Sequence, residues 1–322
     1  MKFSCVAAVL LATTVTPTGF AAEKTAYPAR PIRILVPTPP GGGNDIMARM
    51  AGQKMNERWG QPVVVDNRPG AGGQIAMESS AHAAPDGYTL LLGTTNLTVL
   101  PSMTRVAYDP VRDFVPVALI ATSANLLLIH PAVEAKWLQQ LLAPARAKPG
   151  QLNYASASIA SSTQLAAELM KSLARVDITH IPYKGAGPAL VDLLAGQVQI
   201  MFSNPAASAA HVRSGRLRAL AVTSEKRLPD FPELPTMVEA GLPGYEASTW
   251  WGILAPRATP APVIAQLNEV VSNAITAGDV RSRIAALGAQ PAGGPPGELA
   301  ALISAEIPKW TRVIKEAGIR LD

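Results

Sequence analysis

The stretch "ILVPTPPGGGNDIMARMAGQKM" runs from Ile34 to Met55 and changes its pattern at the centre. It begins as an apolar run, breaks at three prolines and three consecutive glycines, and continues with apolar residues at helical spacing. The pattern predicts a strand, a tight turn and a helix with Asn44 or Asp45 as its N-cap. A helix N-terminus presents amide donors without acceptors, and glycine lets an anion approach them closely. The turn therefore favours a carboxylate or phosphate site, although such turns also form simply to make a tight connection.

The same alternation of apolar strand and amphipathic helix continues along the chain, which indicates βαβ units around parallel sheets. The predicted strands are 32–38, 62–69, 88–95, 124–131, 152–158, 178–183, 198–204, 217–224 and 248–256. The predicted helices are 44–60, 74–84, 136–147, 162–174, 186–196, 260–278 and 296–318.

This organisation predicts an α/β protein with two lobes. Lobe 1 is expected to hold 23–123 plus 253–322, with the terminal helices capping it, and lobe 2 to hold 124–252. The chain crosses between them near 123–126 and 248–253. Two crossings make a hinge with a cleft between the lobes, which is a common place for small molecules to bind.

The first 22 residues differ from the rest of the chain. Lys2 precedes the apolar stretch "FSCVAAVLLATTV", and small residues follow before the charged "EKTAYPAR". Segment 1–22 is therefore interpreted as a secretory signal peptide, cleaved near Ala21 or Ala22. The only cysteine, Cys5, lies inside it, so disulfides and thiol chemistry are excluded from the mature chain. An exported, cysteine-free protein of this size fits a bacterial periplasm.

Four turns share the pattern of a strand end followed by glycines or small polar residues at a helix start. In an open parallel sheet these carboxyl ends lie on the side where ligands bind. Each turn alone is weak support, because serine and threonine are also good caps. Tyr183 adjoins the "KG" turn and is favoured as a contact. The candidate ligand-binding residues are Pro40, Gly41, Gly42, Gly43, Asn44, Asp45, Thr94, Thr95, Asn96, Ser158, Ser161, Ser162, Thr163, Tyr183, Lys184, Gly185, Ser203 and Asn204.

Other functional classes find little support in the residues. The 28 basic residues are scattered without interleaved aromatics, which argues against nucleic-acid binding despite the formal charge of +5. "PGAGGQIA" lacks the third glycine of the dinucleotide motif, and neither a P-loop nor a nucleophile elbow occurs. The four histidines have no metal-ligand spacing. We therefore expect no catalytic residue, no metal site and no cofactor. Of Trp250 and Trp251, one can face the core and the other the cleft, although packing alone is favoured.

Several segments carry a resemblance that covers essentially the whole mature chain. "YPARPIRILVPTPPGGGNDIMAR", "GQPVVVDNRPGAGGQIAMESSAHAAPDGYTLLLGT", "LNYASASIASSTQLAAEL", "HIPYKGAGPALVDLLAGQVQIMF", "GRLRALAVTSEKRLPDFPELPTMVEAGLPGYE" and "WWGILAPRATPAPVIAQLN" occur in order. Together they resemble the Bug family, the periplasmic solute receptors of tripartite tricarboxylate transporters.

The resemblance implies a type II periplasmic binding protein fold, with a mainly parallel sheet flanked by helices in each lobe. It implies a small carboxylated ligand in the cleft, held by the turn from Pro39 to Asp45 and by second-lobe turns at Ser158–Thr163 and Lys184–Gly185. It also implies a monomer that docks on the large and small membrane subunits of a permease.

The chain departs from the common family pattern at three positions. Ser203 replaces a frequent aspartate, Gln164 replaces a frequent histidine, and Leu100 precedes Pro101 where the family commonly has an asparagine. These positions border the expected cleft, so the ligand cannot be transferred from a relative. The missing acid at 203 makes an amine-bearing ligand less favoured. Two alternatives stay open: a receptor of the same fold that feeds a sensor kinase, and an exported hydrolase or lyase.

Overall fold

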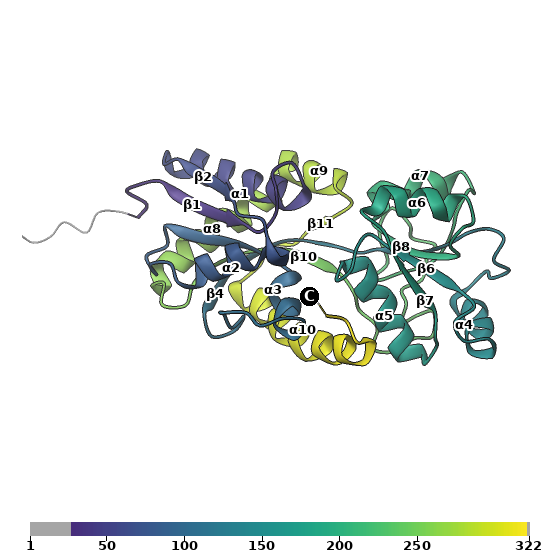
Figure 1. The fold of residues 1–322 in the computed structure, drawn as a ribbon. Helices are drawn as coiled ribbons and strands as arrows, with labels where there is room; N and C mark the ends of the chain where they lie inside the picture. Colours follow the sequence, from purple (N-terminus) through teal and green to yellow (C-terminus); the bar gives the residue numbers. More distant parts are fainter. Residues whose placement is uncertain (1–26, 321–322) are drawn as a thin grey trace, which may run out of the picture.

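The computed structural model describes residues 27–320, which form two α/β lobes side by side (Figure 1). The expected signal peptide at 1–22, with Cys5, lies outside the described residues. The sheet of the first lobe contains β1 (Ile32–Val36), β2 (Val63–Asn67), β3 (Thr89–Thr94), β4 (Phe114–Ser123), β10 (Thr249–Pro256) and β11 (Gln290–Pro291). The sheet of the second lobe contains β5 (Leu126–Ile129), β6 (Asn153–Ser156), β7 (Thr179–Pro182), β8 (Ile200–Ser203) and β9 (Arg218–Val222).

Helices cover both faces of each sheet. In the first lobe, α1 (Gly43–Trp59), α8 (Ala261–Thr276) and α9 (Gly278–Ala286) pack on one face. On the other face lie α2 (Gln74–Ala81), α3 (Asn96–Val99) and the start of α10 (Pro296–Ala317). In the second lobe, α4 (Leu138–Ala147) and α5 (Ser162–Ala174) pack on one face, and α6 (Ala186–Leu194) and α7 (Pro205–Arg213) on the other. Two 3₁₀ turns, η1 (Ala71–Gly73) and η2 (Leu100–Ser102), complete the order.

The apolar strand runs of the sequence follow from this layering. On β5, Leu127 and Ile129 face the α4/α5 side, whereas Leu126 and Leu128 face the α6 side. Neighbouring side chains of a strand point to opposite faces, so a strand covered on both faces is apolar throughout. This is why "LLLI" shows no alternation. Within residues 27–320, no helix combines the length and apolar character needed to cross a membrane.

Both sheets are mixed: most strands run in one direction, as expected of a mainly parallel sheet, and the crossing strand of each runs against its neighbours. Strands β1, β2 and β3 pair in parallel, but β10 lies between β3 and β4 and is antiparallel to both. In the same way β5 lies between β8 and β9, antiparallel to both, while β6 is parallel to β7 and β8. The reason is the crossing. A strand that enters a lobe from the other lobe begins at the edge of the sheet where the carboxyl ends of its neighbours lie, so it runs antiparallel to them.

The crossing strands also determine where the strand ends lie. Ser123, the last residue of β4, pairs with Thr249, the first residue of β10. Leu126, the first residue of β5, pairs with Ser203 and Val222 at the ends of β8 and β9. The carboxyl ends of the other major strands therefore point toward the crossings in both lobes. Since β10 belongs to the first sheet from Thr249 onward, residues 249–252 lie with that sheet rather than with the second lobe.

The last helix differs from the expectation that the terminal helices cap the first lobe alone. Leu299 and Ile303 near its start pack in the first lobe, under the sheet. Trp310, Val313 and Ile314 near its end pack in the core of the second lobe. Figure 1 shows α10 running along the bottom of the molecule from one lobe to α5 of the other, with which it is in contact. The apolar stripe of α10 is long enough to serve two cores.

Candidate functional site

The glycine turn after β1 begins α1 one residue earlier than expected. Gly42 is the N-cap, with extended backbone and no side-chain cap, and the helix starts at Gly43. Asn44 and Asp45 therefore stand inside the first turn, which corrects their assignment as N-cap. Asp45 reaches back so that its Oδ2 accepts the N–H of Gly41 at 2.9 Å. An acid at the third helical position that reaches back in this way fixes the entry of the chain.

The carboxylate of Asp45 is buried and bonded to other groups of the protein. It is 4% exposed and accepts hydrogen bonds from Arg49 Nε at 2.9 Å and Asn67 Nδ2 at 3.0 Å. The hydrogen bond from Arg49 is the main reason that the pKa of this carboxyl is lowered. Asp45 therefore stays ionised and shapes the turn. The amides of the first helical turn have no acceptors within a helix.

The two tryptophans of β10 lie on opposite faces of the first-lobe sheet. Trp251 is 9% exposed, and its Nε1 donates to Asn44 Oδ1 at 2.6 Å. A methyl group added to Gly43 would lie 3.8 Å from the same indole. Trp250 is 1% exposed and points to the opposite face of the sheet. Trp251 thus supports the glycine turn from beneath, and Trp250 belongs to the hinge described below.

In the second lobe, the serine turn after β6 is held by its own hydroxyls. Ser161 is the N-cap of α5, and its Oγ donates to the carbonyl of Ser158 at 2.7 Å. Thr163 Oγ1 accepts the N–H of Ala157 at 3.1 Å. The N–H of Gly185 donates to the Ala157 carbonyl at 2.7 Å and so joins the turns after β6 and β7. These groups build the wall of the second lobe, and Ser158 stays exposed.

A cavity of about 210 Å³ lies between the lobes at these strand ends. The first lobe contributes Gly72, Asn96 and three apolar residues from α3 and η2, and the second lobe contributes 158–161. Asn96 Nδ2 donates to the Gly72 carbonyl at 2.9 Å, so the two first-lobe polar groups of the lining are joined. The cavity approaches the size of small-molecule sites, about 300 Å³ and above. It joins polar groups of both lobes in one space.

The structure brings only part of the candidate set into this cavity, namely Asn96, Ser158 and Ser161. The turn at 40–45 lies at the neighbouring strand end, with Pro40, Gly41 and Gly42 exposed. Thr94, Thr95 and Thr163 are buried, Ser162 is half-buried, and Lys184 is exposed. The remaining candidates point elsewhere: the Tyr183 hydroxyl donates to Asp192 on α6 at 2.7 Å, Ser203 is 2% exposed, and Asn204 caps α7 and donates to Ser123 Oγ at 2.7 Å.

Six of the residues that line the cavity were not among the candidates, and two of them, Gly72 and Ile159, differ in how visible they were in the sequence. Gly72 belongs to the run from Gly70 to Gly73, in which all four residues have positive φ. The sequence "PGAGG" follows a strand just as the other turns do, so its position was a usable signal. Ile159 is 53% exposed on the cavity wall. An apolar residue inside a serine-rich turn gives no such signal, because only the meeting of the lobes places it there.

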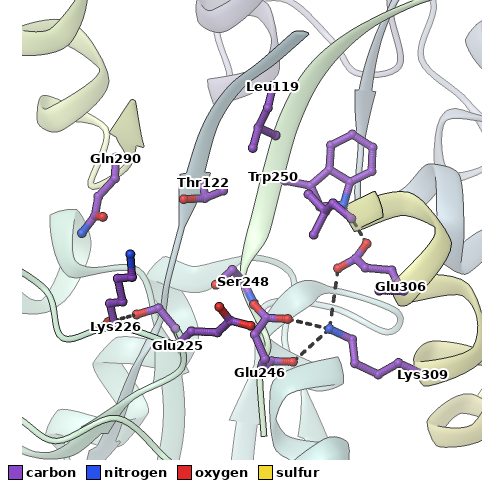
Figure 2. Close-up of a pocket in the computed structure, with 13 residues that line it drawn as sticks. Leu119, Thr122, Glu225, Lys226, Glu246, Ser248, Trp250, Gln290, Glu306 and Lys309 are labelled. Atoms are coloured by element: carbon purple, nitrogen blue, oxygen red, sulfur yellow. Dashed lines mark hydrogen bonds and ion pairs between the residues drawn. The ribbon is translucent and has the colours of Figure 1, made fainter. Parts of the chain in front are cut away.

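A second cavity of about 460 Å³ lies at the hinge (Figure 2). Its walls come from Thr122 and Gln290 of the first sheet, Glu225 and Lys226 after β9, and Glu306 of α10. It shares no lining residue with the cavity at the serine turn. The two crossings and α10 therefore meet around a space with both charged and apolar walls.

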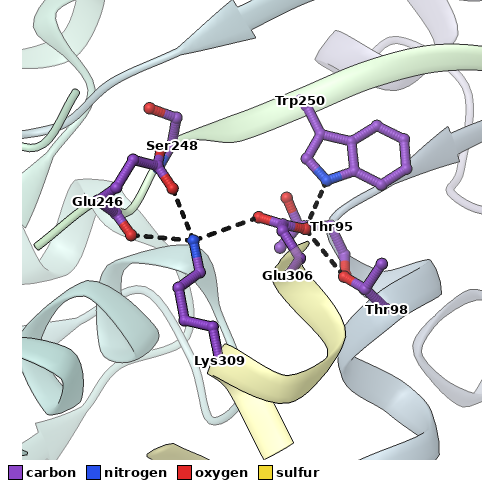
Figure 3. Close-up of polar contacts among 7 residues, drawn as sticks. All are labelled: Thr95, Thr98, Glu246, Ser248, Trp250, Glu306 and Lys309. Atoms are coloured by element: carbon purple, nitrogen blue, oxygen red, sulfur yellow. Dashed lines mark hydrogen bonds and ion pairs between the residues drawn. The ribbon is translucent and has the colours of Figure 1, made fainter. Parts of the chain in front are cut away.

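Glu306 is the buried centre of this hinge (Figure 3). It is 1% exposed, its Oε2 accepts Trp250 Nε1–H at 2.7 Å, and the Thr98 hydroxyl lies 2.9 Å from the same oxygen. Lys309 Nζ lies 3.9 Å from Glu306 Oε1 and 2.6 Å from Glu246 Oε2. Glu246 precedes β10 in the chain. This network links α10, α3, β10 and the second crossing.

Burial is the largest influence on Glu306 and raises the pKa of its carboxyl, while Lys309 and the hydrogen bonds lower it only in part. The geometry agrees with a raised pKa. Thr98 Oγ1 also lies 2.8 Å from the Thr95 carbonyl oxygen and has a single proton, so a protonated Glu306 lets Thr98 donate to Thr95 and accept from the acid. Among residues 27–320, Glu306 Oε1 has no hydrogen-bond partner.

The parent protein is expected to lose stability as pH rises and Glu306 ionises, and the Glu306→Gln variant is expected not to show this loss. A carboxyl whose pKa is raised in the folded state binds protons more tightly there than in the unfolded state. Its contribution to the free energy of unfolding is therefore present below the ordinary pKa and is lost as pH rises through the folded pKa. The free energy of unfolding of the variant, relative to the parent protein, should therefore increase from pH 4.5 to pH 8. Denaturant titrations across this range measure the difference. Glu269→Gln, at an exposed position of α8, should show no such trend. A difference that is constant with pH contradicts the assignment.

Two α/β lobes joined by crossing strands, with polar strand ends of both lobes at one cavity, define a two-lobed solute-binding protein. Solved structures share this arrangement. The adipate complex of R. palustris Rpa4515 is 37% identical, with a TM-score of 0.74 over 91% of this chain and 99% of that chain. MatC from Rhodopseudomonas palustris with bound malate is 36% identical, with a TM-score of 0.72 over 89% of this chain and 100% of that chain.

The family model of the tripartite tricarboxylate transporter family receptor matches residues 47–319. Protein BugT of Bordetella pertussis is 40% identical over 308 residues, which is 94% of each chain. The chain therefore belongs to the family of tripartite tricarboxylate transporter receptors. The resemblance to the Bug family and the two-lobed type II fold are confirmed, and the protein is a solute-binding receptor of this transporter class.

Proposed function

We propose that this receptor binds a small carboxylated solute between its lobes in the periplasm and, as a monomer without catalytic activity, delivers it to the large and small membrane subunits of the transporter. The observation that carries the proposal is the cavity of about 210 Å³ to which both lobes contribute polar turns. The relatives with adipate and malate support the class of ligand.

The binding mechanism uses peptide groups rather than a cationic fork. The first-turn amides of α1, at the neighbouring strand end, offer partial positive charge, and the second Nδ2–H of Asn96 and the hydroxyl of Ser158 are donors from opposite lobes. A charge-assisted hydrogen bond contributes about 1.5–3 kcal/mol. Three or four of them can support a micromolar Kd, about −8.2 kcal/mol, after the costs of immobilisation and closure. Each lobe holds part of the ligand, so the ligand stabilises the closed arrangement.

A screen of organic acids by thermal unfolding tests this function. Adipate, malate and other small acids are compared with adipamide, a neutral analogue of adipate. An acid present at about 100 times its Kd should raise the free energy of unfolding by about 2.7 kcal/mol. Adipamide should leave the free energy of unfolding unchanged, because it lacks the negative charge that the backbone N–H groups recognise. Equal stabilisation by acid and amide, or none by any acid, contradicts the proposal.

A further inference from the structure

A chain of buried polar groups lies directly beneath the serine turn of the second lobe. Gln164 of α5 is 5% exposed, and its Oε1 accepts the N–H of Ala160 at 2.6 Å. The Nε2 of the same side chain lies 3.3 Å from His180 Nδ1 on β7. His180 Nε2 lies 2.6 Å from Ser156 Oγ, which donates to the Ser158 carbonyl at 3.0 Å. The chain thus begins and ends at the turn that lines the cavity.

The partners assign every proton in this chain. The single proton of Ser156 Oγ goes to the Ser158 carbonyl, so the hydroxyl accepts from His180 Nε2–H. The Gln164 amide donates from Nε2, so His180 Nδ1 is the acceptor and carries no proton. His180 is therefore neutral, with its proton on Nε2. This arrangement satisfies all three side chains at once.

A second proton on His180 breaks the arrangement at one of two places. The protonated Nδ1 becomes a donor and faces the donor end of the Gln164 amide. If Gln164 turns its oxygen to the histidine, its NH₂ faces the N–H of Ala160, which then loses its acceptor. A single amide cannot accept from both groups in this geometry. Protonation is thereby transmitted to Ala160.

Ala160 is the sensitive point of the turn. It has φ +62°, a left-handed conformation that a residue with a Cβ rarely adopts. Its N–H bond to Gln164 helps to hold that conformation, and Ala160 lines the cavity together with Ser158 and Ser161. Loss of this bond releases the wall of the second lobe from its present shape.

The titratable groups that face His180 are Glu168 and Lys171 of α5 and Tyr154 of β6. Glu168 favours the protonated ring and Lys171 opposes it, while the Tyr154 ring stacks on the imidazole at 4.8 Å and donates its hydroxyl proton to Glu168 at 2.5 Å. Lys171 Nζ also lies 3.0 Å from Glu168. Burial is the largest influence and lowers the pKa of His180 below its ordinary value. The neutral form therefore prevails at neutral pH, and protonation requires a pH below the ordinary pKa of histidine.

We propose that Gln164 and His180 are positioning residues that hold the cavity wall at Ala160 in its ligand-binding shape only while His180 is neutral, so that affinity for an acid falls on protonation. This inference rests on the proposed binding of acids, but the protein contacts that carry it do not involve the ligand.

The first experiment follows the relay without any ligand. In the ¹⁵N-labelled protein, the Ala160 amide resonance should shift with the same midpoint as the His180 ring protons, which His180→Asn identifies among the four histidines. In Gln164→Met, which has no amide, the Ala160 resonance should no longer follow the His180 titration. The exposed His82 provides the control, since His82→Asn should leave the coupling intact. An Ala160 resonance that ignores the His180 titration in the parent protein overturns the proposal.

The second experiment measures the Kd of adipate or malate at pH 7.5 and at a pH below the midpoint of the His180 titration found in the first experiment. The parent protein should lose about five- to tenfold in affinity, the scale of one hydrogen bond. Gln164→Glu should lose less than about twofold, because a carboxylate accepts from both Ala160 and protonated His180. Titration of the ligand itself is common to both proteins and cancels in the comparison. An equal loss in both contradicts the relay. If neither acid binds at any pH, the proposed function fails, while the resonance experiment still decides the relay.

Discussion

Substitution Ile159→Glu should reduce the affinity for adipate by about 100-fold while leaving the fold intact. Ile159 is 53% exposed and lines the cavity between the lobes, so the new carboxylate lies at the bound acid without entering a core. Two like charges about 6 Å apart repel by about 3 kcal/mol at an effective dielectric constant of about 20. Isothermal titration calorimetry measures the change in Kd, and circular dichroism checks that the variant is folded.

Two further variants separate charge from shape and from position. Ile159→Gln has a similar length without the charge and should change the Kd by less than about fivefold. Val191→Glu adds the same charge to α6, where Val191 is 63% exposed and lies outside the cavity, and should leave the Kd within about twofold. If Ile159→Glu binds adipate as the parent protein does, the cavity at the serine turn is not the acid site.

Substitution Gly73→Ala should destabilise the first lobe by about 3 kcal/mol and lower Tm by about 6 to 12 °C. Gly73 has φ +101°, which an L-residue rarely adopts. The added methyl group would also lie 2.7 Å from Pro37 Cβ and 3.4 Å from the Pro37 carbonyl oxygen. A proline ring cannot move aside as a flexible side chain can, so the turn before α2 must shift. Thermal and denaturant unfolding measure the loss.

Gly42→Ala provides a matched control in the neighbouring turn. Gly42 is also the N-cap of a helix, but its φ is −84° and an added methyl group meets no atom within 4 Å. This variant should change the free energy of unfolding by less than about 1 kcal/mol. Equal losses for Gly42→Ala and Gly73→Ala would mean that backbone conformation and space do not distinguish the two glycines.

Local sequence signals predicted most elements because those elements depend on nearby residues. The strand–turn–helix at Ile34–Met55 was visible in the change of apolar spacing and in the glycines. The strand β4 and the helix α7 were not predicted, although the first eight residues of β4, "FVPVALIA", form an apolar run. Pro116 within that run weakens the local strand signal, and pairing with β10 on one side overrides it.

The candidate site was predictable by turn type but not by side-chain direction. Hydroxyls and amides at strand ends indicated a polar cleft, and three of those residues line the cavity. Asp45, Thr163 and Gly185 instead form hydrogen bonds with backbone groups of the turns themselves. A sequence shows that a group can donate or accept a hydrogen bond, and only the neighbours in space decide which partner it meets.

The amino-acid sequence by itself determined the family, the two blocks of strands and helices, and the glycine and serine turns at the strand ends. These features depend on residue type and spacing, which are local properties of the chain. The tertiary structure decided that β5 and β10 run against their neighbours, that α10 serves two cores, and that Ile159 meets Gly72 across a cavity. It also placed Gln164 between Ala160 and His180. Such contacts depend on where neighbouring strands and helices meet in space, and their energies exist only once those elements are packed.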